Sequence, residues 1–107
     1  MGTMRLATQD EIFNRPQFGC FNGAMITASI NELTAVLGEE NVGESGDGKT
    51  LHEWAVMFNG KFFSIYDWKE YRNYPENEQI EWHIGSSYNS TTDEEFADAV
   101  REALKKL

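Results

Sequence analysis

Hydrophobic positions recur along the chain with two periods, two residues in some segments and between three and four in others. In residues 52–68, HEWAVMFNGKFFSIYDW, two apolar runs flank Asn59 and Gly60. An Asn-Gly pair between two such runs favours a type I′ turn and therefore predicts a β-hairpin. Pairing outward from this turn sets the register. It joins Phe58 with Lys61, Val56 with Phe63, Trp54 with Ile65 and His52 with Asp67 on one face, and Met57 with Phe62, Ala55 with Ser64 and Glu53 with Tyr66 on the other.

Four further segments carry clear patterns. Residues 25–29, MITAS, form a short strand candidate, and residues 79–85, QIEWHIG, alternate cleanly and predict another strand. Residues 29–38, SINELTAVLG, predict a helix, because Ser29 and Glu32 fit the capping box and the apolar residues recur at helical spacing. Residues 91–107 predict a C-terminal helix with hydroxyl caps and acidic residues first and basic residues last, as the helix dipole prefers.

Residues 1–24 mix polar and aromatic residues with Pro16, Gly19 and Gly23, and we expect an irregular N-terminal arm or loop there. Residues 25–107 then form a single α+β domain with the order β-α-β-β-β-α. Each helix has one apolar stripe to bury, so a small antiparallel sheet with two helices packed on one face is the economical architecture.

The composition limits the partners that this domain can have. The 107 residues carry a net charge of −9, so a broad contact with a nucleic-acid backbone is not expected. No apolar run is long enough to span a bilayer, the first residues lack the apolar stretch of a secretory signal, and the one cysteine, Cys20, fits a reducing compartment. We therefore expect a cytoplasmic protein that makes no membrane contact.

Residues 43–50, GESGDGKT, match the P-loop pattern of nucleotide triphosphatases. A working P-loop lies between a strand and a helix, so that backbone N–H groups and a helix N-terminus converge on phosphate. Here a predicted helix precedes the segment and a predicted strand follows it, while Glu44 and Asp47 bring negative charge to the place of the phosphates. We interpret the match as one of chance.

Other catalytic or metal chemistry has weak support. Cys20, His52, Asp67 and His83 include the residue types of a nucleophile, a base and an orienting acid, but an opposite-charge pair across a hairpin is also an ordinary sheet stabiliser. The Cys and His residues lack the close spacing of a zinc site. We expect no enzymatic activity, no catalytic residue, no metal and no cofactor.

A binding surface has better support. The hairpin register places Met57, Phe62, Tyr66 and Trp68 on the sheet face away from the predicted core, beside Glu53 and His83. Such a patch indicates a partner, a second subunit or a covering segment, and residues 1–24 with Phe13, Phe18 and Phe21 are the alternative cover. In DWKEYRNYP, residues 67–75, cations alternate with rings, a pattern that can hold a nucleobase and its phosphate. The candidate binding residues are Phe62, Tyr66, Trp68, Lys69, Tyr71, Arg72 and His83.

Residues 25–87 also resemble a set of small uncharacterised proteins encoded by bacteriophages. The likeness rests on an ITAS-like strand, a helix that ends in Leu-Gly-Glu, and the motifs IYDWK and WHIG. The chain departs from this pattern at Gly85-Ser86, where a second glycine is usual, and at FNGKF, where an Asp-Gly-Thr turn is usual. The resemblance implies a phage protein that acts in the bacterial cytoplasm, and it assigns no catalytic residue.

Three functions remain open at this point. The first is a non-enzymatic binding protein that blocks a host factor, such as an antiviral defence protein. The second is a sponge that sequesters a small cyclic nucleotide immune signal in an aromatic and cationic pocket, completed by another copy of the chain. The third is a DNA mimic, for which the acidic charge would stand in for phosphates.

Overall fold

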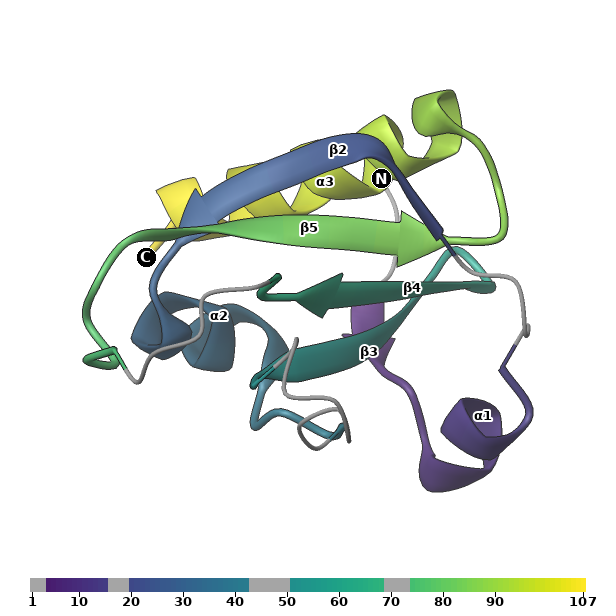
Figure 1. Ribbon diagram of the computed structural model, residues 1–107, viewed down its shortest axis with the longest axis horizontal. Helices are drawn as coiled ribbons and strands as arrows, with labels where there is room; N and C mark the ends of the chain where they lie inside the picture. The colour runs from purple at the N-terminus through teal and green to yellow at the C-terminus, as the bar shows by residue number, and fades with distance from the viewer. Residues whose placement is uncertain (1–3, 16–19, 43–50, 69–73) are drawn as a thin grey trace.

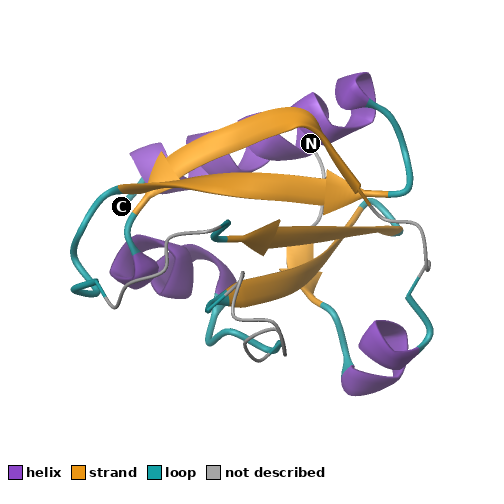
Figure 2. Ribbon diagram, viewed as in Figure 1, coloured by secondary structure: helices purple, strands orange, loops and turns teal. Residues whose placement is uncertain are grey.

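A computed structural model describes residues 4–15, 20–42, 51–68 and 74–107. Five strands and three helices follow one another in these ranges: β1 (Met4–Leu6), α1 (Gln9–Phe13), β2 (Cys20–Ala28), α2 (Ile30–Leu37), β3 (Glu53–Phe58), β4 (Lys61–Tyr66), β5 (Ile80–Ser86) and α3 (Ser90–Lys105). The strands form one antiparallel sheet in the order β1-β3-β4-β5-β2. The α+β class with helices α2 and α3 against the sheet is confirmed (Figures 1 and 2).

The β3–β4 hairpin has the predicted register at every pair from Phe58–Lys61 to Glu53–Tyr66. Asn59 and Gly60 form its turn with φ angles of 53° and 78°. Both angles lie in the left-handed region that a type I′ turn requires and that Asn and Gly tolerate best. The local turn chemistry therefore fixes which side chains face the core and which face away.

The predicted helix ends are also present, with one difference. Ser29 and Glu32 form the reciprocal capping box at the start of α2, and Gly38 ends that helix with a φ of 106°. Helix α3 begins one residue before the predicted segment, and its N-cap is the Asn89 side chain, which accepts a hydrogen bond from Thr92 N. An asparagine amide oxygen caps a helix as well as a hydroxyl does.

The N-terminal segment differs from the irregular arm that the sequence predicts. It contains β1, α1 and the first part of β2, so it supplies one outer strand of the sheet and the start of the other (Figure 1). Strand β1 has only three residues, and the pairing of β2 with β5 shifts between Phe21 and Met25, around Gly23 with its φ of 102°. A strand this short and a strand with an interrupted alternation leave little period-two signal to read.

The core lies between the sheet and helices α2 and α3. Its two indoles, Trp54 and Trp82, are fully buried and meet edge to face with ring centroids 5.4 Å apart. Both indole N–H groups are satisfied, since Trp54 donates to Gly38 O and Trp82 to Ala28 O, each at 2.9 Å. No helix in the described ranges combines the length and the apolar character that crossing a membrane requires.

Candidate functional site

Side chains that alternate with the core residues of β4 and β5 form the opposite face of the sheet. A row of four rings crosses this face from β2 over β5 to the end of β4, and we call Phe21, His83, Tyr66 and Trp68 the aromatic row. Phe21 stacks on His83 with centroids 4.2 Å apart and planes 21° apart. Tyr66 then meets His83 at 5.7 Å and Trp68 at 6.2 Å, both edge to face. Such spacings are those of interacting aromatic pairs.

The pairing of β2 with β5 explains why Phe21 joins the row. Phe21 lies directly opposite Gly85, which has no side chain, and His83 lies two residues away on the same face of β5. A diagonal neighbour in an antiparallel pair is within reach of an aromatic side chain. The Phe21 ring can therefore lean over Gly85 onto His83.

The aromatic row is open to solvent at both ends. Phe21 and Trp68 are each 40% exposed, whereas Tyr66 and His83 between them are half-buried. On β3 the same face is closed near Ala55, which is fully buried. A partner would therefore meet the row over β2, β5 and β4 and at the Glu53 end of β3, rather than over the middle of β3.

Four of the seven candidate binding residues lie on this face. Tyr66, His83 and Trp68 belong to the aromatic row, and Phe62 pairs with Met57 on the same face nearer the hairpin turn. The other three candidates, Lys69, Tyr71 and Arg72, lie outside the described residues.

The alternative to a partner is that residues 1–24 cover this face, and two of the three rings in that segment lie in the described residues. Phe21 does cover part of this face, because it stacks on His83, whereas Phe13 at the end of α1 is 89% exposed and covers none of it. Phe18 lies outside the described residues. The sequence names Phe21 as a possible cover for this face and not as a binding residue, because the irregularity at Gly23 hides its phase relative to Met25.

His83, one of the two inner rings of the row, is poorly placed to carry charge. Burial lowers its pKa below the usual 6.5, and the nearby Glu81 carboxylate opposes this shift only in part. At neutral pH the imidazole is therefore uncharged. It can stack as a flat ring without presenting a cation.

The carboxylate of Glu53, on β3, lies beside the row at Tyr66. Glu53 lies directly opposite Tyr66 in the hairpin, and its side chain is only 15% exposed. Burial raises the pKa of Glu53 above its usual 4.5, the charge of Asp67 adds to the rise, and Arg15 at 3.4 Å opposes it. The single, half-exposed guanidinium of Arg15 thus compensates this charge incompletely.

Asp67 anchors the end of β4 from the core side. Its fully buried carboxylate accepts hydrogen bonds from Leu51 N at 2.8 Å, His52 N at 3.0 Å and Tyr74 Oη at 2.8 Å. Because Asp67 lies between Tyr66 and Trp68 in the chain, these bonds fix the backbone from which both rings project.

The predicted opposition of His52 and Asp67 is present in the backbone, since Asp67 N donates to His52 O at 3.3 Å. The His52 ring has a different partner, because its Nδ1 lies 2.7 Å from Glu40 Oε2. Asp67 is thus committed to backbone and Tyr74 donors rather than to orienting an imidazole. Among the described residues, no three His, Cys, Asp or Glu side chains are grouped to hold a metal ion.

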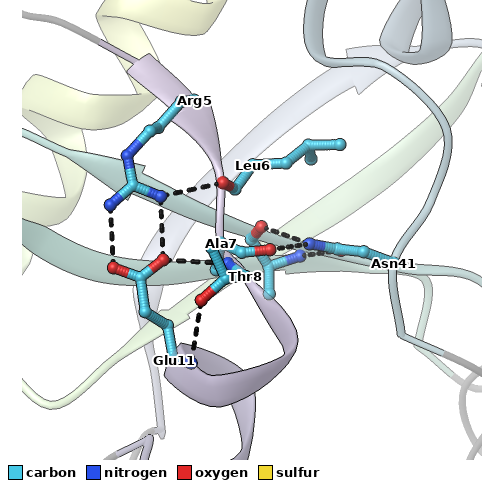
Figure 3. A network of polar contacts seen from close by, with 7 residues as sticks. Arg5, Leu6, Ala7, Thr8, Glu11 and Asn41 are labelled. Atoms are coloured by element: carbon cyan, nitrogen blue, oxygen red, sulfur yellow. Dashed lines mark hydrogen bonds and ion pairs between the residues drawn. The ribbon is translucent and has the colours of Figure 1, made fainter.

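The two outer strands are less available to a partner than the face. Arg5 donates to Leu6 O of β1 at 3.1 Å and forms a two-bond pair with Glu11, which lowers the pKa of Glu11 to about 2 (Figure 3). On the other edge, Arg101 of α3 donates to Met25 O of β2 at 2.6 Å. Charged side chains along an edge hinder the addition of a further strand.

Asn41 extends this protection along β3. Its amide donates to Ala7 O and Ala55 O, and its oxygen accepts from Ala55 N at 2.7 Å (Figure 3). The bridge between Val42 and Glu53 continues the pairing beyond the end of β1. The aromatic row therefore remains the better candidate for a binding site among the described residues.

The segment 43–50 that matches the P-loop pattern lies outside the described residues. The elements on either side are those that the sequence predicts, namely α2 before the segment and strand β3 after it. A strand in the position where a P-loop requires a helix lacks the N-terminal N–H groups that bind phosphate. The absence of enzymatic activity stays a prediction.

The chain matches no protein-family model and no curated protein. The resemblance to phage proteins therefore stays a prediction that rests on the quoted motifs alone.

Proposed function

We propose that this chain is a non-enzymatic binding protein that blocks a protein of its bacterial host, with the aromatic row as its docking surface. The observation that carries the proposal is the continuous contact of four rings across three strands, with 40% of Phe21 and of Trp68 left exposed. Aromatic residues are enriched in protein interfaces, and Tyr and Trp are among the residues that contribute most of the binding energy there.

The phage origin and the antiviral defence target are part of this proposal and rest on the resemblance of the ITAS, IYDWK and WHIG motifs. The net charge of −9 supports a target with a basic surface, because opposite charge speeds and selects the encounter. A stoichiometric blocker needs a surface and no catalytic group, which fits the commitment of Asp67 to structural hydrogen bonds.

A small cyclic nucleotide is the second candidate, and one observation favours it. The outer rings Phe21 and Trp68 offer exposed flat faces, and base stacking on such a ring contributes about 1–3 kcal/mol per base. The net charge of −9 weighs against it, because a phosphate has to approach a negative field. We therefore place the protein target first.

The proposal is tested by affinity capture from bacterial lysate with the wild-type chain and two variants. The double variant Tyr66→Ala and Trp68→Ala removes the β4 end of the aromatic row. Phe13→Ala is the matched control, because it removes an even more exposed ring that lies on α1. We expect the captured protein to be lost with the double variant and retained with the control.

Three other results would contradict the proposal. Equal capture by the wild-type chain and both variants would show that the contact lies outside the row. Capture that ignores the double variant but falls steeply with added salt would favour the DNA mimic, whose contact is electrostatic. A rise in melting temperature with cyclic nucleotides, with no protein captured, would favour the nucleotide sponge.

A further inference from the structure

One end of the aromatic row combines a carboxylate with two rings. Glu53 is the cross-strand partner of Tyr66, and Tyr66 contacts Trp68 at 6.2 Å. Side chains directly opposite each other in an antiparallel pair have Cβ atoms about 4.5–5.5 Å apart. A group that stacks on Tyr66 is therefore within reach of the Glu53 carboxylate.

A guanidinium already lies at this carboxylate. Arg15 Nη1 approaches Glu53 Oε2 at 3.4 Å, through one nitrogen, and the Arg15 side chain is 46% exposed. An ion pair this long, with its guanidinium half-exposed, is weak and can be exchanged for another. The pKa of Glu53 nevertheless stays raised, so a stronger cationic partner would stabilise its charged form further.

The surroundings favour a cation over a neutral or anionic group. The faces of Tyr and Trp rings attract cations, and Glu81 adds an exposed carboxylate on the same face of β5 as His83. His83 does not oppose such a cation at neutral pH, since its lowered pKa leaves it uncharged. Among cations, a planar guanidinium can stack on a ring and also form two parallel hydrogen bonds to a carboxylate, which an ammonium cannot.

We infer that the partner presents an arginine to this end of the row, and that its guanidinium stacks on Tyr66 beside Trp68 and pairs with Glu53 in place of Arg15. The inference rests on the proposed function and names the chemistry of the partner's contact. The side chain that it displaces, Arg15, acts as an internal competitor.

The test is an NMR titration of the full chain with N-acetyl-arginine amide, read at the Trp68 indole and the backbone of Glu53 and Tyr66. N-acetyl-lysine amide and AMP are titrated in parallel. We expect shifts at these positions with the arginine probe, and affinities for lysine and AMP that are lower by about tenfold, the effect of one such interaction.

Three variants make the test specific. Glu53→Gln removes the charge with little change of shape and should weaken arginine binding about tenfold. Arg15→Ala removes the competitor and should strengthen it severalfold, which a merely structural role for the Arg15–Glu53 pair does not produce. Glu94→Gln, an exposed carboxylate on α3, is the control and should leave binding unchanged.

The outcomes separate this inference from the proposed function. If arginine causes no shifts while the double variant still abolishes capture of a host protein, the inference is wrong and the docking surface stands. Shifts with AMP but not with arginine overturn the inference in favour of a planar base. Shifts with arginine that are the same in Glu53→Gln also contradict it, because the pairing with Glu53 is then absent.

Discussion

The buried carboxylate of Asp67 offers the sharpest prediction about how the site is held. Asp67 Oδ1 accepts from two backbone N–H groups, Leu51 N and His52 N, and Oδ2 accepts from Tyr74 Oη. We consider three substitutions that remove different parts of this arrangement, namely Asp67→Ala, Asp67→Asn and Tyr74→Phe.

The expected costs follow from which donors lose an acceptor. Asp67→Ala removes all three hydrogen bonds and leaves two backbone donors behind, which should cost about 3–5 kcal/mol. Asp67→Asn can keep both backbone bonds through its amide oxygen, while its NH₂ donates to Tyr74 Oη, so we expect about 1–2 kcal/mol. Tyr74→Phe removes one of the three bonds and should cost about as much as the asparagine.

Urea unfolding measures these free energies, and a small domain has only about 5–15 kcal/mol in total. Asp67→Ala should lower the melting temperature by more than about 10 °C and should also broaden the NMR signal of the Trp68 indole, because the backbone beside it loses its anchor. An asparagine variant as damaged as the alanine variant would refute the reasoning, since the negative charge itself would then carry the stability. A cost under about 1 kcal/mol for alanine would refute it as well.

Three further predictions concern the face, the turn and the edge of the sheet. Because the folded state lowers the pKa of His83, the unfolded chain takes up the proton first, so stability is full above pH 6.5 and falls as the pH drops through that value. Urea unfolding at about pH 7.5 and about pH 5.5 should show a smaller difference for His83→Gln than for the wild type. Gly60→Ala should cost about 1–2 kcal/mol in urea unfolding, because its φ of 78° strains a residue with a Cβ even though the space around it is open. Arg101→Ala should free Met25 O on the edge strand β2 and cause concentration-dependent self-association in light scattering, whereas Lys105→Ala on the same helix should not.

Where structure is set by neighbours in the chain, the sequence predicts it well. The hairpin register follows from Asn59-Gly60, and the start of α2 follows from Ser29 and Glu32. Each of these features depends on contacts within a few residues, so local chemistry decides them. The placement of Phe62 and Tyr66 on the face away from the core follows from the same register.

The missed features depend on contacts between distant segments. Strand β1 is extended because it pairs with β3, about fifty residues later. Its three residues carry too little period-two alternation to predict that pairing. The sequence names Phe21 as a possible cover for this face, but only the β2–β5 pairing reveals that its ring stacks on His83, where Gly85 leaves room for it. The Arg15–Glu53 pair, on which the arginine inference depends, is likewise a contact between remote segments.

Trp68 makes the central claim directly measurable. It is 40% exposed, whereas the other two tryptophans, Trp54 and Trp82, are fully buried, so acrylamide quenching of the tryptophan fluorescence reports mainly on the row. The Trp68→Phe variant supplies the background of the two core indoles. Binding of the captured host protein, prepared with its own tryptophans replaced, should reduce the quenching of the wild-type chain to near that background. Full binding of the host protein with quenching of Trp68 unchanged would contradict the aromatic row as the docking surface.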